Sequence, residues 1–297
     1  MRQAHGTAPT SYVSRMTLHV SRPLLVFSFL VSLFVLLACR ATPTPPPAIH
    51  FKIGSADSTQ YIARETANAY RRAHPTTTFD FFTSNSTTAL RQLSFHQFDF
   101  AFIERNPRAD ELERANATAL ELGRDGVFVI VHPSNPLQNI SRDDLKKILT
   151  GEFSLWSQMG IAAPNGRDEI QVLMREEGSG MRAVIEEHIM QGARITPTAL
   201  LQPTNLDMLA YVAEHPHAIG YVAANIWDEN SRTRVLGIDN FAATHGNIRA
   251  GTYPLLQTVF LIVPQTPNES ITSFVDFLAS SDGRSILYQR ISELPAK

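Results

Sequence analysis

Two patterns of apolar residues alternate along this chain. Short apolar runs predict strands at 49–53, 78–82, 98–103, 127–131, 170–174, 219–222 and 258–263. Between them, apolar residues recur every three or four positions, which predicts helices near 59–74, 87–94, 108–116, 141–149, 181–190, 205–214, 271–279 and 283–289. Strands that alternate with helices are typical of α/β proteins. We therefore expect an α/β fold.

The beginning of the chain has the pattern of an export signal. Residues 1–38 carry three arginines and no acidic residue, and end in an apolar run from Pro23 to Ala38. A basic segment followed by a short apolar one predicts a secretory signal peptide, and the run is too short for a confident membrane span. The translated start is either the first methionine or Met16, and both leave this prediction unchanged.

A single cysteine follows the apolar run directly. Leu36-Leu37-Ala38-Cys39 looks like a bacterial lipoprotein cleavage box, so we expect lipidation of Cys39; an incidental buried cysteine is the alternative. With one cysteine, no intramolecular disulfide can form. Residues 39–48 are rich in proline and predict a semi-rigid tether. Together these features predict an extracytoplasmic protein anchored to the cell membrane.

The charge balance excludes some classes of partner. Removal of residues 1–38 takes away three arginines and no acid, which moves the net charge from −2 to −5. An acidic balance of this size argues against binding to nucleic acid or to an anionic membrane surface. The remaining length suits one large or two modest domains. No internal repeat or metal-finger spacing is present in the sequence.

The stretch from Arg175 to Arg182 carries the chemistry of an oxyanion site. It places a cation, two glycines and a hydroxyl where an apolar strand gives way to a helix, and Ser179 is the natural N-cap. A helix start offers unpaired N–H groups and a partial positive charge, and Arg175 adds a charge-assisted contact. The alternative is a capped helix that binds nothing. This octet alone leaves both interpretations open.

Two further strand-to-helix junctions carry small polar residues. They are the segments 54–59 (Gly-Ser-Ala-Asp-Ser-Thr) and 83–88 (Thr-Ser-Asn-Ser-Thr-Thr). In an open α/β sheet, ligands bind beyond the carboxyl ends of the strands, so these junctions and the octet could face one crevice. Their joint occurrence with Arg175 favours a buried anion as the ligand.

These motifs, in this order, resemble the phosphate-binding lipoproteins of phosphate ABC transporters, which have the type 2 periplasmic-binding-protein fold. The matching segments are Gly54-Ser55 with the helix that ends at His74-Pro75, Asp99 through Arg105, His132 through Trp156, Arg175 through Arg182, 218–222 and 253–263. The resemblance implies two hinged lobes, each a mixed sheet flanked by helices, with the ligand in the cleft. Lobe 1 would comprise 49–131 and 223–297, and lobe 2 would comprise 132–222. A membrane permease would receive the anion.

The resemblance also implies a ligand set. Its members are Ser55, Ser86, Asp99, Arg175, Ser179 and Gly180, with neighbouring candidates at Ala56, Asp57, Thr88, Arg105, Gly178 and Met181. Asp99 would select hydrogen phosphate over sulfate, because a carboxylate accepts a hydrogen bond only from a protonated oxyanion. The chain departs from the family where Ala56 and Asp57 replace hydroxyl residues, where Glu104 precedes Arg105, and where Met181 replaces threonine.

Other chemistry finds little support in the sequence. His215-Pro216-His217 has no nearby third ligand for zinc. The Gly-x-Ser-x-Gly pattern is absent around Ser179, and His188 lies too far along the helix to activate that hydroxyl. We therefore expect a monomeric binding protein rather than an enzyme, with no metal or cofactor. A surface lipoprotein that senses or scaffolds with the same fold is the alternative to transport.

Overall fold

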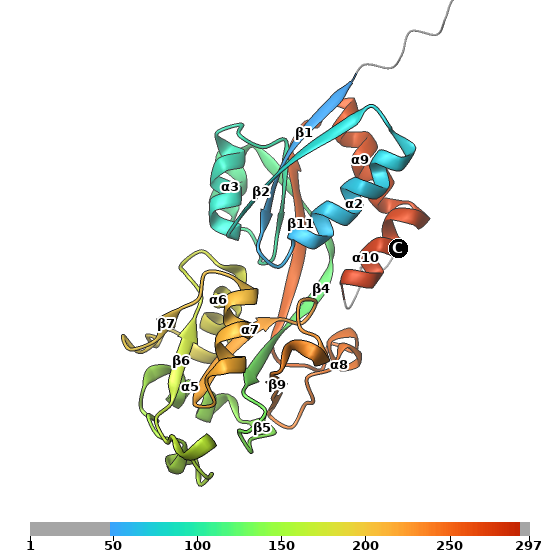
Figure 1. The fold of residues 1–297 in the computed structure, drawn as a ribbon. Helices are drawn as coiled ribbons and strands as arrows, with labels where there is room; N and C mark the ends of the chain where they lie inside the picture. The colour runs from blue at the N-terminus through green and yellow to red at the C-terminus, as the bar shows by residue number, and fades with distance from the viewer. Residues whose placement is uncertain (1–47, 292–297) are drawn as a thin grey trace, which may run out of the picture. The chain divides into compact units, whose positions relative to one another are not determined.

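Two long strands lie side by side at the centre of the folded body. The computed structural model describes residues 48–291, and within them β4 (Ala117–Val131) and β11 (Leu256–Pro264) lie antiparallel. β4 pairs with β11 along its first part and with β8 (Ala218–Ala223) along its second. One strand therefore serves two halves of the molecule, and Figure 1 shows it passing between them.

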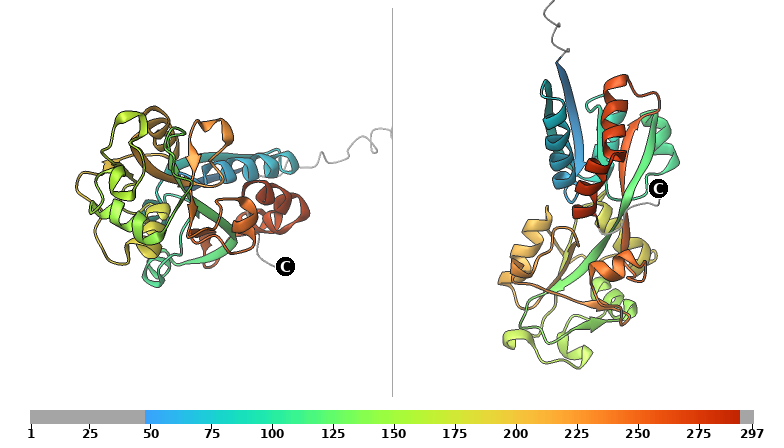
Figure 2. Two further views of the ribbon diagram at one scale, coloured as in Figure 1. Left: turned by 90° about the horizontal axis from the view of Figure 1, so that it is seen from below. Right: turned by 90° about the vertical axis from the view of Figure 1, so that its right-hand side faces the viewer.

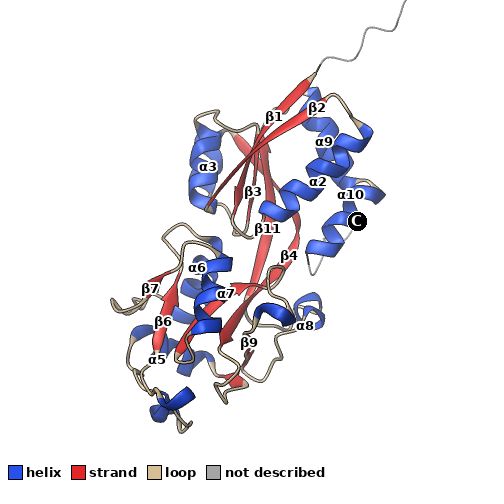
Figure 3. Cartoon of the chain, viewed as in Figure 1, coloured by secondary structure: helices blue, strands red, loops and turns tan. Residues whose placement is uncertain are grey.

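The first half, which we call lobe 1, is a sheet covered on both faces. Its strand order is β2-β1-β3-β11-β4, in which β1 (Ile49–Ala56), β2 (Thr77–Ser84) and β3 (Phe100–Ile103) are parallel. Helices α2 (Gln60–Ala73), α9 (Glu269–Ala279) and α10 (Ser281–Arg290) lie on one side, whereas α3 (Ser86–Ser94) and α4 (Ala109–Ala115) lie on the other (Figure 3).

Alternation along the strands explains this arrangement. Phe100 and Phe102 join the aromatic core beneath α2 and α9, while Ala101 and Ile103 pack with α3 and α4. Successive side chains of a strand point to opposite faces, so a strand covered on both sides reads as a continuous apolar run. This is why 98–103 could be recognised as a strand from the sequence.

The second half, lobe 2, packs around the remainder of β4. Its strands are β8, β6 (Gln171–Met174), β7 (Leu200–Leu201) and β9 (Arg234–Val235), with a separate pair β5 (Asn139–Ile140) and β10 (Gly237–Ile238). Its helices are α5 (Arg142–Thr150), α6 (Gly180–Ile185), α7 (Asn205–Glu214) and α8 (His245–Arg249). A π-helical turn at Glu186–Met190 extends α6, and three short 3-10 turns lie at Trp156–Met159, Pro164–Gly166 and Glu229–Ser231.

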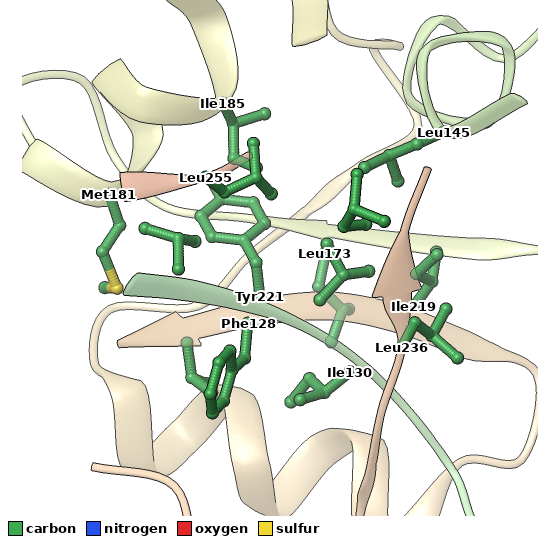
Figure 4. Close-up of a cluster of buried hydrophobic side chains, with 14 of the residues drawn as sticks. Phe128, Ile130, Leu145, Leu173, Met181, Ile185, Ile219, Tyr221, Leu236 and Leu255 are labelled. Carbon is green, nitrogen blue, oxygen red and sulfur yellow. The ribbon is translucent and has the colours of Figure 1, made fainter. Parts of the chain in front are cut away.

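Figure 4 shows the buried core of lobe 2, in which the side chains of Phe128 and Tyr221 lie on opposite sides of the sheet. The same core contains Leu236 and Leu255, which come from residues that the sequence assigned to lobe 1. By packing, lobe 1 therefore comprises 49–126 and 256–291, and lobe 2 comprises 127–255. The packing differs from the expected boundaries at 131 and 222, because the chain crosses between lobes within β4 and at the start of β11 (Figure 2).

The expected strands and helices are present, with shifts of a few residues at their ends. The main element missed is the first part of β4, 117–126, because its sequence Ala-Thr-Ala-Leu-Glu-Leu-Gly-Arg-Asp-Gly contains no continuous apolar run. The predicted signal peptide, Cys39 and the predicted tether up to residue 47 lie outside the described residues. No helix between residues 48 and 291 is long and apolar enough to cross a membrane.

Candidate functional site

Polar junctions from both lobes meet at one place. The backbone N–H of Thr87, in the first turn of α3 of lobe 1, donates to the carbonyl of Gly178 in lobe 2 at 3.2 Å. Gly180 lies against the end of β3, where an added Cβ would stand 2.3 Å from Cγ of Glu104. Only glycine permits so close an approach of two backbones. The octet therefore faces the strand ends of lobe 1, as the sequence predicts.

Arg175 lies at the centre of this contact, at the carboxyl end of β6. Its side chain is 1% exposed. Nε and Nη2 donate to the Glu176 carboxylate at 3.1 and 3.4 Å, and Nη2 also donates to the carbonyl of Pro203 at 2.8 Å. The Arg175 backbone N–H donates to the Tyr221 hydroxyl at 2.9 Å, and burial raises the pKa of Tyr221 to about 12. The guanidinium is thus held in one orientation.

The remaining contact of Arg175 crosses between the lobes, to Asp57. Nη1 donates to Asp57 Oδ2 at 3.3 Å. The same oxygen accepts from the backbone N–H of Asn205 at 2.7 Å and from its Nδ2 at 2.6 Å, while Oδ1 accepts from Gln60 Nε2 at 3.1 Å. Asn205 is the first residue of α7, where the partial positive charge of a helix start favours a carboxylate. Asp57 is therefore the anion that this site already holds.

Glu104 adds a second buried carboxyl group, directly after β3. The residue is 1% exposed, and Oε2 has no hydrogen-bond partner among residues 48–291. The pKa of Glu104 is raised to about 7, mainly by burial and in smaller part by the Asp57 and Glu176 carboxylates. The Arg175 guanidinium and a hydrogen bond from the Met181 backbone lower it in part. An unpartnered buried oxygen beside a guanidinium is suited to exchange a hydrogen bond with a protonated ligand.

The three predicted serines have hydrogen-bond partners within the protein. Ser55 is 1% exposed, with its hydroxyl 3.4 Å from that of Thr83. Ser86 Oγ accepts from the Glu104 backbone N–H at 3.2 Å. Ser179 is the N-cap of α6, as predicted, and accepts from the Arg182 backbone N–H at 3.4 Å. Ser86 and Ser179 thus lie beside Glu104, whereas the contact of Ser55 is with β2.

Asp99 lies elsewhere. It precedes β3, where its backbone N–H donates to the Lys52 carbonyl at 2.8 Å and its carboxylate accepts from the Lys52 N–H at 2.6 Å. Because Ser55 pairs with Phe102, Asp99 lies three residues back along the strand, which is about 10 Å at the usual rise. The structure therefore does not bring Asp99 to the cluster. Glu104 occupies the carboxyl end of the same strand instead.

The neighbouring candidates divide in the same way. Asp57 and Gly178 lie at the contact between lobes. Met181 offers its backbone there, while its side chain is buried in the core of lobe 2. The remaining three serve local structure: the Ala56 carbonyl accepts from Thr59, the Thr88 N–H donates to Asn85, and Arg105 forms a bidentate pair with Glu111 at 2.8 and 2.7 Å.

Sequence reasoning missed Asn205 and gave Glu104 no role in the site. One signal could have found both: each is a polar residue at the end of a strand or at the start of a helix, where α/β proteins bind their ligands. Asn205 follows the N-cap Thr204 and is held by the Ala223 backbone N–H, which donates to its Oδ1 at 3.0 Å. Among residues 48–291, no three His, Cys, Asp or Glu side chains are grouped to hold a metal ion.

Comparisons with known proteins agree with this architecture. A family model described as the PBP superfamily domain matches residues 41–282. Phosphate-binding protein PstS of Borreliella burgdorferi is 21% identical over 280 residues, which cover 91% of this chain and 97% of the relative.

Two solved structures share the fold. An ABC-type phosphate transport receptor from Vibrio cholerae is 24% identical and superposes with a TM-score of 0.69, covering 82% of this chain and all of that one. A protein from Clostridium perfringens with bound phosphate, described as a phosphate ABC transporter substrate-binding protein, is 21% identical with a TM-score of 0.75, covering 84% of this chain and all of that one. The type 2 periplasmic-binding-protein fold is confirmed.

Proposed function

Because the chain belongs to the PBP superfamily, we propose that it is an extracytoplasmic solute-binding protein of an ABC importer. Its solute is phosphate or a similar tetrahedral oxyanion, bound between the lobes. The observation that carries this proposal is the buried Arg175 guanidinium, which donates across the contact between the lobes to Asp57. The names of relatives as phosphate-binding and phosphate-transport proteins give independent support.

The proposed ligand contacts come from both lobes. Arg175 supplies a charge-assisted hydrogen bond, and Ser55, Ser86, Ser179 and the backbone of Gly180 supply neutral donors. We assign the selective role to Glu104 in place of Asp99. In its ionised form the Glu104 carboxylate accepts a hydrogen bond from hydrogen phosphate, whereas fully ionised sulfate has no proton to donate to it. This chemistry favours hydrogen phosphate, and we infer no catalytic step.

The proposed cellular setting follows from the sequence. A signal peptide over 1–38 would export the chain, and lipidation of Cys39 would anchor it to the membrane. The proline-rich tether would let the lobes reach a permease in the same membrane. We propose a monomer, with no nucleic acid partner and no cofactor. Labelling with a radioactive fatty acid, lost in Cys39→Ser, tests the anchor.

Calorimetry with phosphate, sulfate, arsenate, molybdate and tungstate tests the solute. We expect heat of binding with phosphate and arsenate, and a loss of that heat in Arg175→Ala. Asp276→Asn is the matched surface control, because it changes one charge on an exposed position of α9. If no oxyanion gives heat or a thermal shift with the parent or with site variants, the proposal is wrong.

A sensing or scaffolding role is the second candidate. The contact between Asp57 and Arg175 favours it, because a receptor that holds its own anion need not release a solute to a permease. Uptake of radiolabelled phosphate by cells with and without the gene separates the two. Loss of uptake in the deletion supports transport, and unchanged uptake supports sensing.

A further inference from the structure

The Asp57 carboxylate makes the contacts that a bound oxyanion would make. Three donors of lobe 2 converge on Oδ2: the Arg175 guanidinium, the backbone N–H that begins α7, and the Asn205 side-chain amide, at 3.3, 2.7 and 2.6 Å. A guanidinium with a helix N-terminus is a common arrangement for oxyanion recognition. Here the anion belongs to the protein.

An anionic solute would bind weakly at Arg175 while Asp57 stays in place, because the site is buried and already holds negative charge. The side chains of Arg175 and Asp57 are 1% and 9% exposed. One guanidinium already faces the carboxyls of Asp57, Glu176 and Glu104. A phosphate added to this cluster would meet like charges at short range in a poorly solvated site. Entry of an anion therefore requires that Asp57 withdraw from Arg175.

Asp57 is also attached firmly to lobe 1. Its Oδ1 accepts from Gln60 Nε2 at 3.1 Å, and the adjoining Thr59 hydroxyl donates to the Ala56 and Phe102 carbonyls at 3.1 and 3.0 Å. The carboxylate thus links strand ends of lobe 1 to Arg175 and Asn205 of lobe 2. A bound solute would link the same elements.

We propose that Asp57 is an internal anion that occupies the solute position and that the solute must displace. This proposal rests on the proposed function. A tethered carboxylate competes at a high effective concentration, so it raises the solute concentration needed for binding. It also holds the lobes together when no solute is present. Asp57 thereby sets both the affinity threshold of the site and its closed resting state.

Asp57→Asn tests the competition, because asparagine removes the charge and keeps the size. Calorimetry with inorganic phosphate should show binding at least tenfold tighter in Asp57→Asn than in the parent. Asp57→Ser, which restores a small hydroxyl, serves as the second variant should asparagine fail to fold. Asp276→Asn on the α9 surface should bind as the parent does. Equal affinities within threefold, or weaker binding in both Asp57 variants, would overturn the proposal.

Small-angle X-ray scattering without phosphate tests whether Asp57 holds the lobes together. The parent should have the smaller radius of gyration, and both Asp57 variants should expand and then contract when phosphate is added. If parent and variants scatter alike without phosphate, Asp57 does not hold the lobes together. If the variants expand but neither the parent nor the variants bind any oxyanion, Asp57 does hold the lobes together and the proposed solute is wrong. The two failures are therefore distinguishable.

Discussion

The two halves of the site differ in how the chain supplies their polar groups. Lobe 2 supplies Arg175, Ser179 and Gly180 from one short stretch between β6 and α6. Lobe 1 supplies Asp57 and Glu104 from the ends of separate strands. The first half contributes the buried Arg175 guanidinium, and the second carries two buried carboxyls. A contiguous motif can be recognised from the sequence alone. Residues at the ends of separate strands come together only in a particular strand register, which the sequence does not show.

Of the changes considered, loss of the Arg175 guanidinium should lower the stability of the protein most, because the carboxyls of lobe 1 lose their positive partner. Arg175→Met leaves the buried carboxyls of Asp57 and Glu104, and the half-buried carboxyl of Glu176, without their guanidinium. We expect the free energy of unfolding to fall by about 3–5 kcal/mol, as when one partner of a buried ion pair is removed. Urea unfolding measures this.

Arg108→Met is the matched control for that experiment. Arg108 lies on the surface with a side chain that is 64% exposed, so its ion pairs should contribute less than about 1 kcal/mol. If both variants lose the same small amount of stability, the carboxyls of lobe 1 do not depend on Arg175.

On the lobe 1 side, the pH dependence of stability should reveal the buried carboxyl of Glu104. Burial raises the pKa of Glu104 from 4.5 to about 7, so the folded state keeps a proton that the unfolded state releases between these values. The stability from this group is fully present below pH 4.5 and is lost as the pH rises through 7. In Glu104→Gln this loss is absent, so the variant should gain about 2–3 kcal/mol over the parent across this window.

Urea unfolding of parent and Glu104→Gln at about pH 5 and about pH 8 measures this difference. A gap between the two proteins that stays constant with pH would show that Glu104 is not desolvated in the folded protein.

A side chain added where the two lobes touch should lower the free energy of unfolding by a smaller amount. In Gly180→Ala the new Cβ would lie 2.3 Å from Glu104 Cγ and 2.7 Å from its carbonyl oxygen. We expect a loss of about 1–3 kcal/mol in unfolding free energy, as for other overpacked sites. Gly246→Ala in α8 is the control, since the nearest atom to its Cβ would be 3.7 Å away. Equal stability of the two variants would mean that the lobes do not touch here.

The smallest effect is expected at the other end of β3. Asp99→Asn should change the dissociation constant for phosphate less than twofold, because the carboxylate bonds to Lys52 away from the cluster. Glu104→Gln should weaken phosphate binding and narrow the preference for phosphate over sulfate. Parallel calorimetry of the two variants measures this. Loss of binding in Asp99→Asn alone would return the selective role to Asp99.

These two acids show what the sequence could and could not predict. The run Phe-Ala-Phe-Ile identifies β3, and the rule that ligands lie beyond the carboxyl ends of strands applies to Glu104. The family resemblance pointed to Asp99 instead. The sequence alone does not give the strand register, which decides whether Asp99 or Glu104 lies at the edge of the sheet. Ser179 as an N-cap was predictable because its partner, the Arg182 N–H, is three residues away.

Contacts between distant residues could not be predicted in this way. The Asp57–Asn205 pair joins residues 148 positions apart, and no local pattern specifies it. The first part of β4 was missed for a related reason. Its residues 117–126 are only partly apolar, and pairing with β11 stabilises them as a strand.

A crystal structure of the protein grown with phosphate tests the central claim most directly. Phosphate should lie between the lobes with an oxygen about 3 Å from the Arg175 guanidinium, within hydrogen-bond distance of Glu104. The Asp57 carboxylate should have left Arg175. Phosphate bound elsewhere, or bound at Arg175 with the Asp57 contact unchanged, would contradict the account.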